Sequence, residues 1–351
     1  MKKEIGVIGA GSWGTTLANL LAEKGYTVVL WVFEPDLCQI IEKEHENPVY
    51  LPNFPLSKNI IPTTSIAKTC KDKDIVVSVT PSHVVRSVIS QAIPHFSDQS
   101  IIVSASKGIE NETLLPMSGV FKEILPSSLH KKLVFLSGPS FANEVIKKAP
   151  TAVSVASENM EVAGVVQRVF ATPYFRVYTS SDVIGVELGG ALKNVIAIAA
   201  GASDGLGFGH NTRAALITRG LTEITRLGVH MGANPLTFSG LSGLGDLILT
   251  CTGDLSRNRS VGLELGRGMK LKDILTRMKM VAEGVKTTKA AYCLAGQYDV
   301  EMPITEKIYS LLYEDTPAKD VVTSLMTRDL KCELDAFDTL HLNPNAIESR
   351  E

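Results

Sequence analysis

The chain has 351 residues, of which 44% are hydrophobic and 21% are charged, and its formal net charge is −2. These values are typical of a globular protein that is long enough for two domains. Because there is no basic stripe and no polybasic tail, the sequence predicts neither nucleic-acid binding nor attachment to a membrane surface.

Short apolar runs alternate with helical patterns in the first half of the chain. We expect strands at Ile5–Ile8, Val28–Phe33, Ile75–Thr80, Ile101–Ala105, Leu133–Leu136, Ala152–Ala156 and Phe175–Thr179. Several of these runs are continuously apolar, as in strands that helices cover on both faces. The alternation predicts an α/β domain over residues 1–182, built on a parallel, doubly wound sheet.

The first strand runs into a glycine-rich turn that opens a helix. Gly9, Gly11 and Gly14 have the spacing G-x-G-x-x-G, which is a weak signal alone but stronger between a strand and a helix. Gly9 permits the tight turn, Gly11 lets the backbone approach a pyrophosphate, and Gly14 allows close helix–strand packing. Helix N–H groups then face the phosphates. This predicts a Rossmann-type dinucleotide site; the alternative is an ordinary turn with incidental glycines.

Glu34 ends the second predicted strand, twenty residues after Gly14. A carboxylate there can accept hydrogen bonds from an adenosine ribose and would repel a 2′-phosphate. The preceding residues, Trp31, Val32 and Phe33, supply no basic group for such a phosphate. The sequence therefore favours NAD(H), with NADP(H) as a possible second cofactor, unless Glu34 is only a solvated turn residue.

Helical patterns dominate after Asp182. We expect helices at Val183–Ala200, Thr212–Leu227, Leu271–Arg277, Thr287–Gln297, Thr305–Tyr313 and Ala318–Leu325. They predict an all-α C-terminal domain over residues 183–335. The final stretch, 336–351, has no amphipathic pattern and is expected to be a loosely ordered tail.

Lys193 stands in the apolar stretch "GGALKNVIAIAAG". An unpaired ammonium is costly in such surroundings, so a lysine there requires an explanation. Hydride addition to a ketone leaves negative charge on the carbonyl oxygen, and a partly buried lysine with a lowered pKa suits proton donation to it. Asn194 can bond a substrate oxygen, and Lys107 and Asp246 can orient the donor. The alternative is a lysine that reaches to solvent.

A second polar cluster, Ser256-Arg257-Asn258, follows a glycine-rich stretch that contains Asp246. Arginine can bind a phosphate in a bidentate manner, and a helix that starts here adds its dipole. The cluster predicts an anion site; a solvated polar loop is the alternative.

Other chemistries have little support in the sequence. His83 and His210 lack a supporting pattern and are interpreted as loop or core residues. No H-E-x-x-H motif or Cys/His cluster predicts a metal site.

The five cysteines are scattered, and "MKKEIGVIGAG" lacks the apolar stretch of a leader, so we expect reduced thiols in a cytoplasmic protein. No apolar run approaches the roughly 18 residues of a membrane span.

Several longer motifs resemble those of NAD(P)-dependent glycerol-3-phosphate dehydrogenases. They include "GAGSWGTTLA", "HENPVYLPN", "SASKGIE", "LSGPSFANEV", "GGALKNVIAIAAG", "LGDLILTCTGDLSRNR" and "EMPITEKIY", in this order between about Ile5 and Leu330. The resemblance implies reduction of dihydroxyacetone phosphate to sn-glycerol 3-phosphate for phospholipid synthesis. It implies a small-molecule substrate and a possible homodimer. Val32 and Phe33 depart from the His or Arg of many bacterial relatives, which puts an NADPH preference in doubt.

The resemblance also implies roles for individual residues. Lys193 resembles the general acid/base. Contacts to substrate are implied for Lys107, Gly138, Ser140, Lys193, Asn194, Asp246, Ser256, Arg257 and Asn258. Contacts to cofactor are implied for Ser12, Trp13, Lys107, Ala142, Val281 and Glu283, and we expect further cofactor contacts from Gly9, Gly11, Gly14, Phe33, Glu34 and Arg257.

Two alternative functions remain at this point. A 3-hydroxyacid dehydrogenase of similar architecture would place its catalytic lysine and asparagine one helical turn apart, whereas Lys193 and Asn194 are adjacent. A non-catalytic NAD-sensing module would lack a proton donor.

Overall fold

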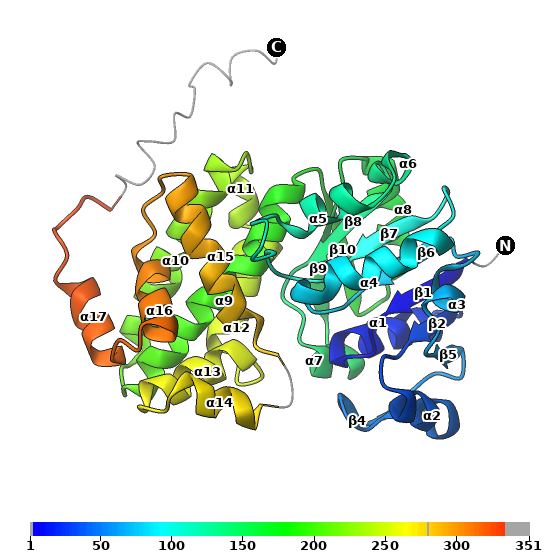
Figure 1. Cartoon of the computed structure of the whole chain (residues 1–351), viewed down its shortest axis with the longest axis horizontal. Helices are drawn as coiled ribbons and strands as arrows, with labels where there is room; N and C mark the ends of the chain where they lie inside the picture. Colours follow the sequence, from blue (N-terminus) through cyan, green and yellow to red (C-terminus); the bar gives the residue numbers. More distant parts are fainter. Residues whose placement is uncertain (1–2, 279–280, 334–351) are drawn as a thin grey trace, which may run out of the picture.

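The computed structural model describes residues 3–278 and 281–333. Figure 1 shows a sheet covered by helices, and beside it a part made only of helices, with the long helix α9 (Val183–Gly205) in the helical part. This arrangement confirms the predicted α/β fold with an all-α region after it. In the described residues after Val183 there is no strand.

One sheet of eight strands has the order β10-β9-β8-β7-β6-β1-β2-β5. Its strands are β1 (Glu4–Ile8), β2 (Thr27–Trp31), β5 (Ile60–Thr63), β6 (Ile75–Ser78), β7 (Ile101–Ser104), β8 (Leu133–Ser137), β9 (Thr151–Ala156) and β10 (Phe175–Ser180). A separate short hairpin pairs β3 (Glu46–Asn47) with β4 (Leu51–Pro55).

The prediction of a fully parallel sheet is wrong at one pair of strands. β8 and β9 run antiparallel, while all other neighbours in the large sheet are parallel. A parallel return needs a crossover, usually a helix laid over one face of the sheet. The β8–β9 connection holds only the five-residue helix α7 (Ala142–Ile146), so the chain folds back beside β8.

Helices cover both faces of the sheet. Successive residues of β6 point to opposite faces, because Ile75 and Val77 share a core cluster with Leu17 whereas Val76 shares another with Phe121. The first face carries α1 (Ser12–Glu23), α2 (Pro35–Glu44) and α8 (Met160–Phe170). The other carries α3 (Ile66–Cys70), α4 (Val85–Ala92), α5 (Met117–Ile124) and α6 (Ser127–His130). The doubly wound arrangement is confirmed.

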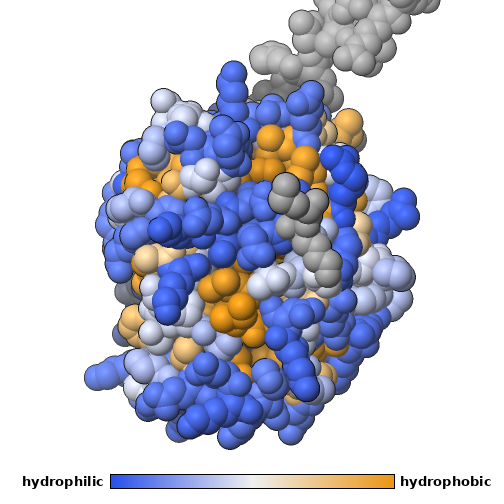
Figure 2. Space-filling view, turned by 90° about the vertical axis from the view of Figure 1, so that its right-hand side faces the viewer, coloured by the Kyte–Doolittle hydropathy of each residue, from blue (hydrophilic) through white to orange (hydrophobic). Residues whose placement is uncertain are grey.

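Two strand predictions need correction at the edge of the sheet. β2 ends at Trp31 instead of Phe33, and Glu34 stands at the N-cap of α2 rather than in the strand. β5 was not predicted because Pro62 interrupts its apolar pattern; proline is tolerated there because β5 pairs only with β2. Figure 2 views this end of the molecule, where hydrophilic residues dominate and hydrophobic ones form small patches.

The helical region contains every helix that the sequence predicted in it. Besides α9 it comprises α10 (His210–His230), α11 (Pro235–Phe238), a π-helical turn (Leu241–Gly245), α12 (Asp246–Thr252), α13 (Arg257–Gly266), α14 (Leu271–Arg277), α15 (Glu283–Gln297), α16 (Pro303–Tyr313) and α17 (Ala318–Met326). The short helices α11 and α12 were not predicted. The domain division at residue 182 stays a prediction, and the proposed tail at 336–351 lies outside the described residues.

Helix α9 forms the core of the helical region. By length and mean composition it could cross a membrane, but Glu187 and Lys193 interrupt its apolar residues and 89% of its most apolar window is buried inside the protein. It packs tightly against α13. A Cβ atom on Gly201 would lie 2.0 Å from the Arg259 carbonyl oxygen, and one on Gly262 would lie 2.0 Å from the Ile198 carbonyl oxygen. The two helices therefore touch backbone to backbone.

Candidate active site

The glycine-rich turn after β1 has the geometry of a dinucleotide cradle. Gly9 has φ +113°, in the region that favours glycine. A Cβ atom on Gly14 would lie 1.9 Å from the Gly9 carbonyl oxygen, so only glycine lets α1 start this close to the strand. At Gly11 a Cβ atom would meet no heavy atom within 4 Å. The turn is thus closely packed at its base and open on its outer side.

The residues around this turn fit a dinucleotide pyrophosphate. No side chain caps the N-terminus of α1, so N–H groups of its first turn remain available to an anion. The Thr16 hydroxyl donates to the Ser12 carbonyl oxygen at 2.8 Å and lies 3.5 Å from the Ala142 carbonyl oxygen. Trp13 is half-buried, with its ring centroid 6.5 Å from that of Phe175. Ser12 and Trp13 therefore lie in the first turn of α1, and Ala142 lies next to that helix.

Glu34 lies beside the short hairpin and has a hydrogen-bond partner there that the sequence analysis did not predict. The Tyr50 hydroxyl donates to Glu34 Oε1 at 2.7 Å, and this bond raises the pKa of Tyr50 to about 12. The Asn47 side chain also joins the hairpin to the glycine turn, because it donates to the Ala10 carbonyl oxygen at 2.8 Å. Phe33 is 74% exposed. The hairpin thus fixes one oxygen of the Glu34 carboxylate.

Asp246 joins two lysines at the carboxyl end of the sheet. Lys193 Nζ donates to Asp246 Oδ1, and Lys107 Nζ donates to Asp246 Oδ2 at 2.6 Å. Lys107 follows β7, Lys193 lies on α9, and Asp246 begins α12, so the contact unites three distant segments of the chain. Asp246 is 1% exposed and Lys193 is 7% exposed. The interpretation of Lys193 as a solvent-reaching lysine is therefore wrong.

Burial lowers the pKa of Lys193 to about 8, although the Asp246 carboxylate acts to raise it and the Lys107 ammonium to lower it further. Thr250 also contacts this lysine, because Lys193 Nζ donates to Thr250 Oγ1 at 2.8 Å. The sequence analysis missed Thr250. Its spacing of four residues from Asp246 on one helix was a usable signal, since such residues share a face. With a pKa near neutrality, Lys193 can both give and take a proton.

Gly138 holds the second lysine. Its carbonyl oxygen accepts from Lys107 Nζ at 3.1 Å and from the Ser140 hydroxyl at 3.0 Å. Gly138 has φ +136°, and a Cβ atom there would lie 3.0 Å from the Val153 Cα. The antiparallel return of β9 beside β8 therefore requires glycine at this position, and the resulting turn aims the carbonyl group at Lys107.

The polar cluster that begins α13 lies next to α9 and α15. Ser256 is the N-cap, and its hydroxyl accepts from the Arg259 amide at 3.2 Å. Asn258 Oδ1 accepts from the Gly284 amide at 2.9 Å. A Cβ atom on Gly284 would also lie 2.7 Å from the Asn194 carbonyl oxygen, so Asn194 and Asn258 are neighbours. Among the described residues, the Arg257 guanidinium has no hydrogen-bond or ion-pair partner; desolvation lowers its pKa, opposed by the nearby Glu283 carboxylate.

Glu283 at the start of α15 completes the arrangement of charges. Its Oε1 accepts from the Ser82 amide at 3.0 Å, which ties α15 to the loop after β6. Burial raises its pKa, opposed by the Ser82 amide and by the positive charges of Arg257, Lys107 and Lys193. Val281 is 40% exposed at the same loop. The site therefore combines three cations with the carboxylates of Asp246 and Glu283, which suits an anionic ligand.

Two family models match the chain. The N-terminal model of NAD-dependent glycerol-3-phosphate dehydrogenase matches residues 4–163, and the C-terminal model of the same family matches residues 182–323. The chain belongs to this family. A glycerol-3-phosphate dehydrogenase [NAD(P)+] from Syntrophotalea carbinolica is 59% identical over 331 residues, which are 94% of this chain and 99% of the relative. One from Geobacter metallireducens is 58% identical over 333 residues, covering 95% and 99%.

A solved structure agrees with the family match. The crystal structure of glycerol-3-phosphate dehydrogenase from Coxiella burnetii superposes with a TM-score of 0.89 at 39% sequence identity, over 93% of this chain and 99% of that one. It supports the mixed sheet followed by a helical region. Within this dehydrogenase fold, the predicted site residues lie at the glycine turn, beside the short hairpin, around Asp246 and at the starts of α13 and α15. Their individual roles stay predictions.

Proposed function

We propose that this glycerol-3-phosphate dehydrogenase reduces dihydroxyacetone phosphate to sn-glycerol 3-phosphate, reversibly, with Lys193 as the proton donor. The observation that carries the proposal is the buried Lys193–Asp246–Lys107 bridge at the carboxyl end of the sheet, where open α/β folds bind their ligands. A ketone oxygen placed against Lys193 Nζ would meet a group whose pKa is near the working pH.

The chain's own residues account for binding and proton transfer. A nicotinamide cofactor, when bound, supplies or accepts the hydride at C2 of the substrate. Gly11, Ser12 and the start of α1 would hold its pyrophosphate. Lys193 Nζ gives its proton to the developing C2 oxyanion, and the Lys107 ammonium adds positive charge beside it. Asp246 keeps both ammonium groups in place, because each of its oxygens accepts from one of them.

Arg257 is expected to bind the substrate phosphate. Replacing it by alanine removes a charged hydrogen-bond donor, so kcat/KM for dihydroxyacetone phosphate should fall about 10- to 100-fold, which corresponds to roughly 1.5–3 kcal/mol. Unphosphorylated dihydroxyacetone should lose much less. Steady-state kinetics with both ketones measures the difference. The matched control is Arg267→Ala, at the exposed end of α13, which should leave both values near wild type. Equal losses on both ketones would assign Arg257 to cofactor or structure instead.

Glu34 is expected to make NADH the preferred cofactor. Tyr50 bonds Oε1 and leaves Oε2 for a ribose hydroxyl, whereas a 2′-phosphate would face a fixed carboxylate. The kcat/KM values should favour NADH by roughly 10- to 100-fold, the scale of a like-charge contact costing a few kcal/mol or less. The double variant Phe33→Arg, Glu34→Ser should shift the preference toward NADPH. Glu44→Ser, on the exposed end of α2, is the control. Preference for NADPH in the natural protein contradicts the proposal.

The wider assignments rest on the family. We propose two domains, at 1–182 and 183–335, a cytoplasmic location, a role in supplying glycerol 3-phosphate for phospholipid synthesis, and a homodimer whose mass in solution can be measured.

The two alternative functions predict different activities with other ketones. A 3-hydroxyacid dehydrogenase would oxidise NADH with hydroxypyruvate or tartronate semialdehyde, and an NAD-sensing module would turn over none of these ketones. Oxidation of NADH by dihydroxyacetone phosphate alone supports the proposal.

A further inference from the structure

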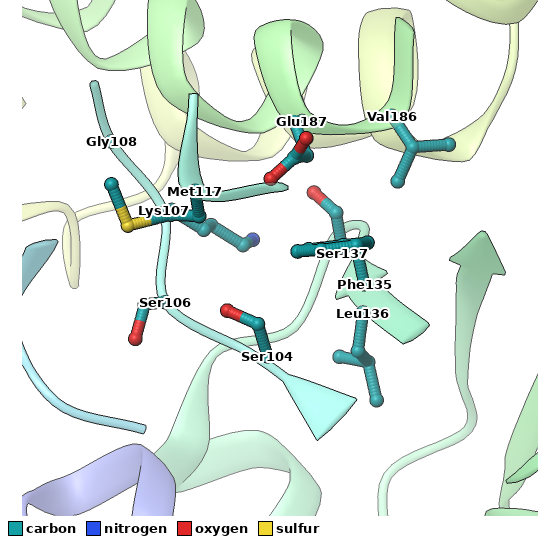
Figure 3. A pocket seen from close by; sticks show the side chains of 10 residues that line it. All are labelled: Ser104, Ser106, Lys107, Gly108, Met117, Phe135, Leu136, Ser137, Val186 and Glu187. Carbon is teal, nitrogen blue, oxygen red and sulfur yellow. The ribbon is translucent and has the colours of Figure 1, made fainter. Parts of the chain in front are cut away.

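Beside Lys107 there is a small cavity, and apart from Lys107 itself the proposed reaction uses none of the polar groups that line it. Its volume is about 10 Å³, close to the smallest that holds one water molecule. Lys107, Ser104, Ser137 and Glu187 contribute to its wall, and Figure 3 shows their polar ends directed into the same space. Ser104 and Ser137 are 2% and 3% exposed.

Three oxygen atoms around this cavity lack a partner among the described residues. They are Ser104 Oγ, Ser137 Oγ and Glu187 Oε2, and each is fully buried. A buried polar atom without a hydrogen bond is costly, and buried polar groups are normally satisfied by protein or by ordered water. Three such atoms around one cavity of this size therefore indicate a bound water molecule, which has the two to four polar partners that it needs.

Glu187 and Lys107 meet at this cavity because α9 approaches the sheet closely there. A Cβ atom on Gly190 would lie 2.4 Å from Ser137 Oγ and 3.6 Å from the Lys107 Cδ. Glu187 is three residues earlier on α9 and so shares this face of the helix. Lys107 Nζ donates two of its three hydrogens to the Gly138 carbonyl oxygen and to Asp246, which leaves one N–H for a further acceptor.

We propose that one ordered water molecule links the Glu187 carboxyl group to Lys107, and that Glu187 is a positioning residue that stores the proton for Lys193. The inference rests on the proposed role of Lys193. After Lys193 gives its proton to the substrate oxygen, it is a neutral amine. Lys107 passes a proton through Asp246 to this amine, takes one from the water, and the water takes one from Glu187. The net change converts the Glu187 acid to its carboxylate and the Lys193 amine to ammonium.

The surroundings of Glu187 suit a group that changes protonation near neutrality. Its Oε1 accepts from the Ser118 amide of α5 at 2.8 Å, and burial raises the pKa of the carboxyl group to about 7. The charged groups that face it are Lys107, after β7, and Lys122 of α5, whose ammonium acts to lower this pKa. Lys122 itself is paired with Glu158. The Glu187 carboxyl group is therefore mostly protonated below pH 7 and mostly ionised above it.

Glu187→Gln tests the proposal, since glutamine keeps the bond from Ser118 but cannot release a proton. We expect kcat for reduction at pH 7 to fall roughly tenfold, below the 10²–10⁴-fold range of a direct donor, with both KM values unchanged. The solvent deuterium isotope effect on kcat should rise, and the change in rate near pH 7 should disappear. Wild-type values of kcat, isotope effect and pH profile would overturn the proposal.

Glu223→Gln is the matched control. Glu223 is buried, with a pKa raised by burial to about 7, but both its oxygens accept hydrogen bonds from Ile304 and Thr305. This variant should lose thermal stability without a change in isotope effect or pH profile. The same kinetic change in both variants would mean a general effect of losing a buried acid, and would also overturn the proposal.

Crystallography of the ligand-free enzyme provides a test that does not depend on activity. High-resolution maps should show a water molecule within hydrogen-bond distance of Glu187 Oε2 and Ser137 Oγ, and Ser137→Ala should displace or disorder it. An empty cavity in the wild type would overturn the proposal even if Glu187→Gln fails to fold. A failure of the proposed function can be distinguished from this result. It would show itself as a Lys193→Met variant that keeps its activity, whatever the maps show in the cavity.

Discussion

Lys193→Met should lower kcat for dihydroxyacetone phosphate reduction by roughly 10²–10⁴-fold, the usual range for loss of general acid catalysis. Methionine has a similar length and no charge, so it fills the apolar surroundings of α9 without placing a new polar group there. The affinity for NADH should remain, because the glycine turn is formed by other segments. Stopped-flow fluorescence measures NADH binding and steady-state assays measure kcat.

The pH dependence of the wild type provides a second measurement of the same group. Reduction needs the Lys193 ammonium, so its rate should fall as the pH rises through about 8, while oxidation needs the amine and should rise through the same range. Lys319→Met, on the exposed face of α17, is the control and should keep both limbs. If Lys193→Met stays within a few-fold of the wild type, another group donates the proton.

Asp246→Asn should affect both activity and stability. The substitution preserves the size of the side chain but removes the charge that holds Lys107 and Lys193, leaving two ammonium groups close together with little access to water. Removing one partner of a buried ion pair typically costs about 3–5 kcal/mol. The pKa of Lys193 should fall below its value of about 8, because the carboxylate that raises it is gone.

Two measurements should show this effect. Reduction at pH 7.5 should fall by about 10²-fold or more, since the remaining Lys193 is mostly neutral, and the midpoint of urea unfolding should fall as well. Asp254→Asn is the control, because Asp254 pairs with Arg259 but its side chain is 96% exposed. It should change neither quantity much. A stable and active Asp246→Asn enzyme would show that the lysines do not depend on this carboxylate.

The sequence predicted those features that depend on local pattern. The strand–helix alternation, the turn at Gly9 and the apolar run around Lys193 each have a local physical cause, and the structure has all three. The direction of β9 could not be predicted in this way, because it depends on whether the connection after β8 crosses back over the sheet or turns directly, and the short helix α7 in that connection was not predicted. Pro62 concealed β5, since a proline argues against a strand unless that strand is known to be at an edge.

The partners of the site residues were harder to predict than the residues themselves. Tyr50 and Thr250 lie within motifs that resemble the family, yet their contacts with Glu34 and Lys193 arise only when distant segments pack together. Glu187 had no signal at all, because a glutamate on an apolar helix is ordinary until the hydroxyls of two separate strands are found beside it. These contacts could not be predicted because they join residues that are far apart in the sequence, whereas the residue types themselves could be recognised.

The close contact at the glycines of α9 and α13 fixes the position of these two helices relative to each other. Because the backbones touch at Gly201 and Gly262, the two helices cannot slide or tilt without collision, and the distance from Lys193 on α9 to the Ser256–Asn258 start of α13 is fixed. We expect this distance to match the span from the ketone oxygen to the phosphate in a three-carbon substrate. Phosphorylated ketones with one carbon more or less would then be rejected by length, although every one of their functional groups is acceptable to the site.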